Sequence, residues 1–200
     1  AARVAAQRSM VLLRNEGGLL PLSEAQQNIA VIGPLADSME ATEGSWMVFG
    51  HKSAAVTVLE GIRARLPEAT ITYAPGPQIH RQFPHPFGEF NLTEKKPIQT
   101  PEDAEAAFQT ALETAQGADL VIMVLGENAD MSGEFASRGS LDLPGRQEEL
   151  LKAITALDKP VVLVLLNGRP LSINWAAENV PAILEAWEPG TEGGHAVADV

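Results

Sequence analysis

Acidic side chains gather in one short stretch of the sequence, where Glu127, Asp130 and Glu134 follow one another closely. A carboxylic acid can donate a proton and its carboxylate can accept one, so such groups can perform general acid–base catalysis. A general acid also needs a raised pKa and a partner carboxylate, and sequence alone indicates neither. Because isolated loop acids are most often solvated surface groups, the stretch marks candidates rather than a site.

Other common chemistries lack the residues they need. The chain has no Cys, which excludes a thiol nucleophile, a disulfide framework and a Cys-ligated metal. The four His residues, His51, His80, His85 and His195, are scattered without a close pair. Neither a G-x-S-x-G nucleophile motif nor a Gly-rich phosphate loop occurs. We therefore expect no cofactor and no metal ion, and the carboxylates remain.

The charge balance limits the partners. Lys and Arg number 14 against 26 Asp and Glu, so the net charge is -12. An acidic surface repels phosphate backbones and anionic lipids, and no apolar run approaches the roughly 18–20 residues that span a bilayer. We expect neither nucleic acid nor a membrane as a partner. With 45% hydrophobic residues the chain can bury an ordinary core.

The apolar pattern predicts an α/β fold. Short apolar runs occupy residues 28–32, 70–74, 119–125, 161–166 and 182–187. Helical spacing separates several of them, around residues 58–66, 104–115 and 150–157, and helices are also expected over 1–14 and 191–200. Strands that are apolar on both faces suit a parallel sheet covered by helices. The expected architecture is a three-layer α/β/α sandwich with a mostly parallel sheet of about five or six strands.

This architecture brings the polar segments together. Residues 33–38, 126–134, 167–170 and 188–194 are polar or Gly-rich, and each follows an apolar run. Ligands of open α/β sheets gather beyond the carboxyl ends of the strands, so the acidic stretch is expected at such an edge. The long connection 75–100, rich in Pro and Phe, is either functional or an insertion packed by its own Phe residues.

A set of motifs, in order, carries a resemblance to a known family. These are S-M-V-L-L-R-N-E-G-G-L-L-P-L at 9–22, I-G-P-L-A-D-S at 32–38, G-S-W at 44–46, S-G-E at 132–134 with Arg138 and L-D-L-P-G-R-Q at 141–147, N-G-R-P at 167–170 and W-E-P-G-T-E-G-G at 187–194. The set resembles the C-terminal α/β sandwich domain of glycoside hydrolase family 3, and is most similar to the bacterial, periplasmic type of β-glucosidase.

The resemblance implies a specific activity. Family members join this sandwich to an N-terminal (β/α)8 barrel that carries the nucleophilic Asp, and the active site lies where the two domains meet. The Glu of the S-G-E motif, here Glu134, would be the acid/base of a retaining exo-β-glycosidase that releases terminal non-reducing β-D-glucosyl residues. Residues 1–200 would then be one domain of a longer periplasmic or secreted protein, carrying half a catalytic site and inactive alone.

The resemblance also implies secondary site residues. Trp46 or Phe49, near the G-S-W motif, would flank a sugar in the leaving-group subsite, since sugar C–H faces pack on flat rings. Trp46 could equally be a core or domain-interface aromatic. Arg138 would contact substrate or orient the Glu134 loop, or be an ordinary surface residue. Glu127 is the rival acid, interpreted as structural because it lies nearer the sheet.

Two other functions stay open at this point. The chain could be a non-catalytic carbohydrate-binding or domain-stabilising module of the same enzyme, in which case Glu134 would affect affinity but not turnover. A free-standing nucleotide- or flavin-binding domain would need a phosphate loop that the sequence lacks. Glucose against xylose, the linkage and the oligomeric state are not determined by these motifs.

Overall fold

The computed structural model describes residues 1–23, 27–47, 54–81, 98–134 and 136–200. A six-stranded sheet forms the centre, in the order β1-β6-β5-β4-β2-β3, and every pair of neighbours is parallel except β1 with β6. The strands are β1 Val11–Asn15, β2 Asn28–Ile32, β3 Thr70–Ala74, β4 Leu120–Gly126, β5 Val161–Leu166 and β6 Ala182–Glu185. The predicted α/β fold with a mostly parallel sheet is confirmed.

The N-terminal segment corrects one expectation. A single helix over residues 1–14 was wrong, because α1 (Ala2–Ser9) ends at Ser9 and β1 follows at Val11. Val11 pairs with Glu185 and Leu12 with Leu184 in the antiparallel ladder that β1 forms with β6. A short apolar run fits a helix or a strand equally well, and here pairing with a distant strand decides between them.

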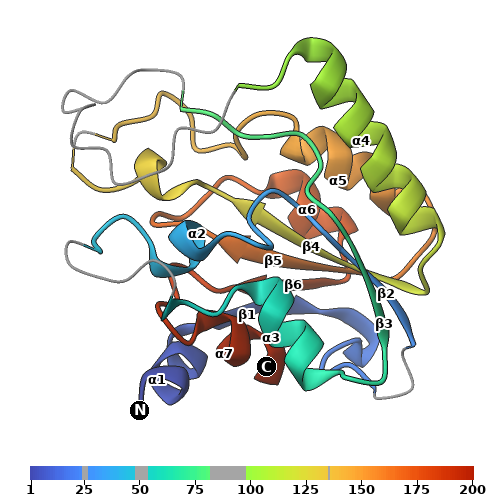
Figure 1. The fold of residues 1–200 in the computed structure, drawn as a ribbon, viewed down its shortest axis with the longest axis horizontal. Coiled ribbons are helices and arrows are strands. Elements are labelled where there is room, and N and C mark those ends of the chain that lie inside the picture. Colours follow the sequence, from blue (N-terminus) through green and yellow to red (C-terminus); the bar gives the residue numbers. More distant parts are fainter. Residues whose placement is uncertain (24–26, 48–53, 82–97, 135) are drawn as a thin grey trace.

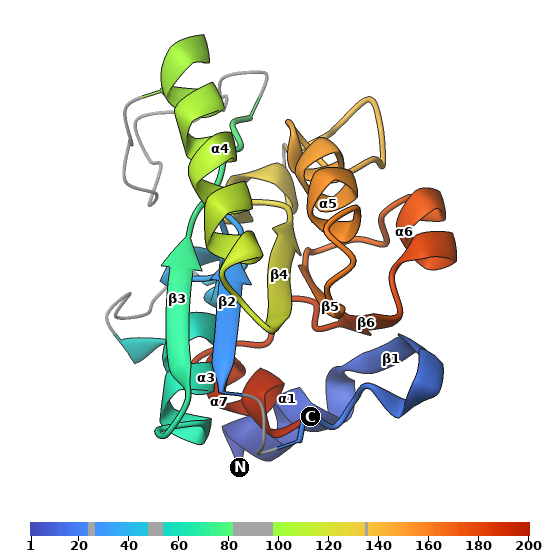
Figure 2. The same ribbon diagram turned by 90° about the vertical axis from the view of Figure 1, so that its right-hand side faces the viewer.

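Helices cover both faces of the sheet (Figure 2). The remaining helices are α2 Met39–Glu43, α3 Val58–Arg65, α4 Pro101–Gln116, α5 Gln147–Thr155, α6 Asn174–Asn179 and α7 Gly193–Asp199. Capping boxes start two of them, Thr57 with Glu60 on α3 and Thr100 with Asp103 on α4. Each box satisfies two backbone N–H groups that a helix N-terminus otherwise leaves without partners. The short α2 and α6 were not predicted.

Alternation along the strands divides the core into two layers. Val31, Ile122 and Val164 belong to the hydrophobic cluster that includes residues of α3 and α7. Their neighbours Met123 and Leu163 belong to the other cluster, which includes residues of α4, α5 and α6. Strands β2, β4 and β5 are therefore buried on both sides, as the continuous apolar runs predicted. No described helix is both long and apolar enough to cross a membrane.

Glycine lets the loops begin close together at the carboxyl edge of the sheet, which lies at the left of Figure 1. Gly126, the last residue of β4, has φ +141°, and a Cβ there would lie 1.9 Å from the carbonyl oxygen of Leu166 on β5. No L side chain fits such a contact. The loops after β2, β4, β5 and β6 start from this edge, so the sheet positions them relative to one another.

Candidate functional site

The candidate site is built on the loop that follows β4, residues 127–136, here called the Glu134 loop. It begins with a 3-10 turn, Ala129–Met131, and continues through Gly133 at φ +88°. A Cβ on Gly133 would lie 3.2 Å from the Cβ of Ser45 and 3.7 Å from a ring carbon of Trp46. The loop therefore packs against the segment that carries Trp46, a contact that the sequence analysis did not predict.

The exposed groups of this site are an acid and an aromatic ring. Glu134 is exposed, and Trp46 is 67% exposed, which is unusual for so large an apolar side chain. Both stand at the carboxyl edge of the sheet, next to the close contact at Gly133. An exposed carboxyl can exchange protons with a ligand, and an exposed indole ring offers a flat apolar surface for one.

Glu127 occupies the opposite environment. Its side chain is buried, and its carboxylate contacts the Arg138 guanidinium at 2.6 Å and the Arg169 guanidinium at 3.2 Å. A buried carboxylate is tolerated when opposite charges and hydrogen bonds compensate its lost hydration. Both of its oxygens are used in this way.

The two arginines extend this contact to both ends of the loop. Arg169 donates hydrogen bonds to the carbonyl oxygens of Met131 and Ala136, the latter at 2.9 Å. Arg138 donates to the carbonyl oxygen of Asp142 at 2.7 Å. The Glu127–Arg138–Arg169 triad therefore holds the backbone at Met131 and Ala136, and sequence motifs alone did not indicate that Arg169 contacts this loop.

The predicted substrate-binding residues lie in different places. Trp46 is exposed at the surface. Arg138 lines a cavity of about 190 Å³ beside the loop, together with His80, Arg81 and Ser140. The Arg138 side chain is only 16% exposed and already bound to Glu127, so its described contacts are those of an orienting residue. Phe49 and residues 82–97 of the long connection lie outside the described residues.

A second buried carboxyl lies below the edge, at the end of β6. Glu185 accepts hydrogen bonds from the backbone N–H of Trp187 at 3.0 Å and from Nδ2 of Asn167 at 3.2 Å. Burial raises the pKa of the Glu185 carboxyl to about 7, and these hydrogen bonds oppose the rise only in part. These contacts give Asn167 and Trp187 a structural role at this edge, and the sequence analysis did not single out Glu185.

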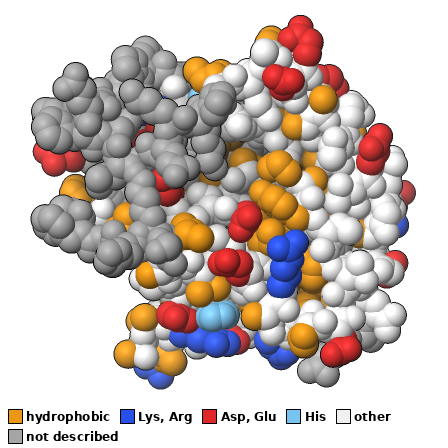
Figure 3. Space-filling model, viewed as in Figure 1, with side chains coloured by type: hydrophobic (Ala, Val, Ile, Leu, Met, Phe, Trp, Pro, Cys, Tyr) orange, Lys and Arg blue, Asp and Glu red, His pale blue; other side chains and the backbone are white. Residues whose placement is uncertain are grey.

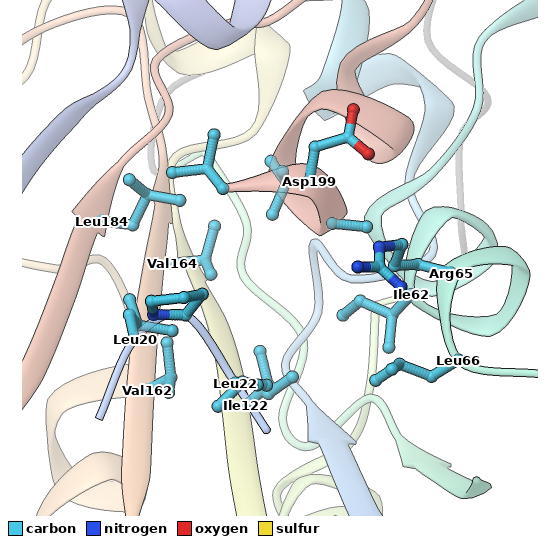
Figure 4. Close-up of a pocket in the computed structure, with 14 residues that line it drawn as sticks. Leu20, Leu22, Ile62, Arg65, Leu66, Ile122, Val162, Val164, Leu184 and Asp199 are labelled. Carbon is cyan, nitrogen blue, oxygen red and sulfur yellow. The ribbon is translucent and has the colours of Figure 1, made fainter. Parts of the chain in front are cut away.

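An apolar groove lies elsewhere in the fold, between α3, α7 and the segment 20–22 (Figure 4). Apart from Arg65 and Asp199 its lining side chains are apolar. Asp199 is bound by Arg3, so the groove offers little for acid–base chemistry. Among the described residues His, Asp and Glu do not gather into a group that could hold a metal ion. Acidic side chains are spread over the face seen in Figure 3 rather than gathered in one patch.

Comparison with known sequences identifies the family. The profile described as "Glycosyl hydrolase family 3 C-terminal domain" matches residues 10–200. The chain belongs to glycoside hydrolase family 3. It is 42% identical to a periplasmic beta-glucosidase of Salmonella typhimurium over all of its length, and 37% identical to a beta-xylosidase of Formosa agariphila over 98% of it.

Solved structures of the family have the same fold. The beta-glucosidase from Listeria innocua, in complex with isofagomine, superimposes with a TM-score of 0.79 at 33% identity, covering 99% of this chain and 24% of that one. The chain spans about a quarter of the length of these relatives, 26% for the Salmonella protein and 25% for the Formosa protein. As a family 3 C-terminal domain, it corresponds to one part of a larger glycosidase in each comparison.

Replacement of Glu127 tests whether the triad is structural. Glu127→Ala leaves two largely buried guanidinium groups without their anion, so we expect the free energy of unfolding to fall by about 3 kcal/mol. The matched variant Glu134→Ala removes an exposed carboxylate and should change it by no more than about 0.5 kcal/mol. Urea unfolding of both variants measures the difference, and equal losses would show that the triad contributes no more to stability than an exposed carboxylate does.

The raised pKa of Glu185 predicts a pH-dependent stability. Between the ordinary pKa of 4.5 and about 7 the folded chain keeps the proton that the unfolded chain releases. The free energy of unfolding should therefore fall as the pH rises through this window, by up to about 3 kcal/mol. Glu185→Gln keeps an oxygen acceptor but does not titrate, so its stability should be flatter with pH and higher at pH 8.

Urea unfolding at pH 5, 6, 7 and 8 measures this effect, with Glu178→Gln on the exposed face of α6 as the control. The control should follow the wild-type pH profile. A Glu185→Gln profile with the wild-type slope would mean that this carboxyl is ionised in the folded protein across the whole range.

Proposed function

We propose that this domain supplies the acid/base, Glu134, to a retaining exo-β-glycosidase whose nucleophilic Asp lies on an N-terminal (β/α)8 barrel of the same polypeptide. The observation that carries the proposal is the division of labour between two carboxylates of one loop. Glu127 is buried and bound by two arginines, whereas Glu134 is exposed on a backbone those arginines hold. An acid/base must reach the substrate, and the exposure of Glu134 supports this role.

In the proposed reaction the Glu134 carboxyl gives its proton to the glycosidic oxygen while the nucleophile attacks the anomeric carbon. The departing alcohol leaves a covalent glycosyl-enzyme and a Glu134 carboxylate. That carboxylate then takes a proton from the water that attacks the anomeric carbon, and retention of configuration follows from the two displacements. The domain alone holds one of the two carboxylates and should not turn over.

The proposed substrate is a terminal non-reducing β-D-glucosyl residue. Trp46 or Phe49 is proposed to lie beside the leaving-group sugar. Support for glucose comes from the 42% identical relative named a periplasmic beta-glucosidase, and the same name supports a periplasmic location. The beta-xylosidase at 37% identity makes xylose the main competing sugar. The exposed ring of Trp46 supports the aromatic contact, and Arg138 acts mainly by orienting the loop.

The experiment compares Glu134→Ala with wild type in the full polypeptide, on aryl β-glucosides of differing leaving-group pKa. Poor leaving groups need the proton in the transition state, so their rate should fall by about 10²- to 10⁴-fold, and activated ones far less. Azide needs no general base, so it should restore turnover and yield a glycosyl azide. The exposed Glu178→Ala serves as the control and should behave as wild type.

The alternative function, a non-catalytic carbohydrate-binding or domain-stabilising module, predicts a different pattern. All substrates would then lose rate by the same modest factor, and azide would restore nothing. That result would reject Glu134 as the acid/base and move the search to Glu127 or to the barrel.

A further inference from the structure

The carboxylate of Glu188 lies at the contact between the two segments that carry the proposed site residues. Its Oε1 accepts a hydrogen bond from the Ser132 hydroxyl at 2.9 Å and another from the backbone N–H of Ser45 at 3.2 Å. The two serine hydroxyls are themselves 3.2 Å apart. Ser132 stands two residues before Glu134, and Ser45 immediately precedes Trp46. One oxygen atom therefore joins both segments.

Two glycines make room for this carboxylate. A Cβ on Gly44, where φ is +84°, would lie 2.3 Å from the carboxyl carbon of Glu188. A Cβ on Gly168 would lie 2.4 Å from the Ser132 hydroxyl and 2.8 Å from Oε1 of Glu188. A side chain at either glycine would displace the Glu188 carboxylate or the Ser132 hydroxyl, so the loops after β2 and β5 pack directly on this contact.

The backbone beneath Glu188 is also held. Trp187 adopts φ +59°, a conformation that few non-glycine residues take. Its N–H donates to Glu185 and its carbonyl accepts from Asn167 at 3.2 Å. Two residues after Glu188, the Gly190 N–H donates to the carbonyl oxygen of Thr42 in α2, at 2.7 Å, four residues before Trp46. The carboxylate thus projects from a fixed point.

This anchor lies between two other contacts of the same loop. The arginine contacts hold the backbone at Met131 and Ala136, and Glu188 adds a contact to the Ser132 side chain, two residues before Glu134. A charged acceptor is suited to the task, since hydrogen bonds to an ionised group are about twice as strong as neutral ones.

We infer that Glu188 is a positioning residue that sets the place of Glu134 relative to Trp46, by binding Ser132 and the backbone of Ser45 with one carboxylate oxygen. The inference rests on the proposed function of Glu134. The W-E-P-G-T-E-G-G motif assigned no role to Glu188, and as a positioning residue Glu188 acts through Ser132 and Ser45 rather than on a reacting atom.

The test uses the full polypeptide with Glu188→Ala, Glu188→Gln and the control Glu192→Gln. Without the anchor Glu134 is misplaced, so Glu188→Ala should lose at least about tenfold more kcat/KM on poor leaving groups than on activated ones, the equivalent of one hydrogen bond. Glu188→Gln keeps an oxygen acceptor and should stay within about threefold of wild type. Glu192 pairs with His195 on α7 and its variant should match wild type.

Amide hydrogen exchange at Ser45 gives a second readout that does not depend on activity. Its N–H should exchange faster in Glu188→Ala and stay protected in Glu188→Gln, because only the alanine removes the acceptor. Should Glu188→Ala fail to fold, Ser132→Ala removes a single hydroxyl from the same contact, and the same preferential loss on poor leaving groups is expected.

The outcomes separate this inference from the proposed function. If Glu134→Ala shows the leaving-group dependence while Glu188→Ala lowers all substrates equally, or leaves Ser45 exchange unchanged, the inference alone is overturned. If Glu134→Ala shows no leaving-group dependence, the proposed function fails and the inference fails with it.

Discussion

The buried carboxylate of Glu127 is the contact on which the geometry of the site depends. It lies directly beyond the end of β4, where hydration is lost, and two guanidinium groups replace the water. Arg169 also binds the carbonyl oxygens of Met131 and Ala136. The cation that compensates the buried Glu127 charge therefore also holds the loop that carries Glu134. Removing either partner would leave a charge uncompensated, which makes the arrangement sensitive to single substitutions.

Four carboxyl groups at one sheet edge thus do different things because their surroundings differ. Glu127 is buried with two guanidinium groups, and Glu188 binds a hydroxyl and a backbone amide. Glu185 is buried with neutral hydrogen-bond donors, and its raised pKa of about 7 keeps it protonated at lower pH. Glu134 is exposed. The first three contact protein groups, and the exposed position of the fourth supports the acid/base role proposed for it.

Most of the fold followed from local patterns, and the exceptions have physical causes. The runs at 28–32, 119–125 and 161–166 are apolar on both faces, and only a doubly covered sheet buries such strands. Strand β1 was missed because its three apolar residues carry no period, and its partner β6 is distant in sequence. In the site, Glu134 was reached through resemblance, since physics alone does not separate one loop acid from another. Glu188 and Ser132 are 56 residues apart, and no local spacing predicts their contact.

The most direct test of this account is the structure of the full polypeptide with a covalently trapped glycosyl-enzyme. A retaining mechanism requires the two catalytic carboxyl groups to be about 5–5.5 Å apart. We predict that separation between the Glu134 carboxyl and the barrel carboxylate that carries the sugar, with Glu127 still bound by its two arginines. A structure in which another carboxyl occupies that position, and Glu134 lies beyond about 10 Å, would contradict the account.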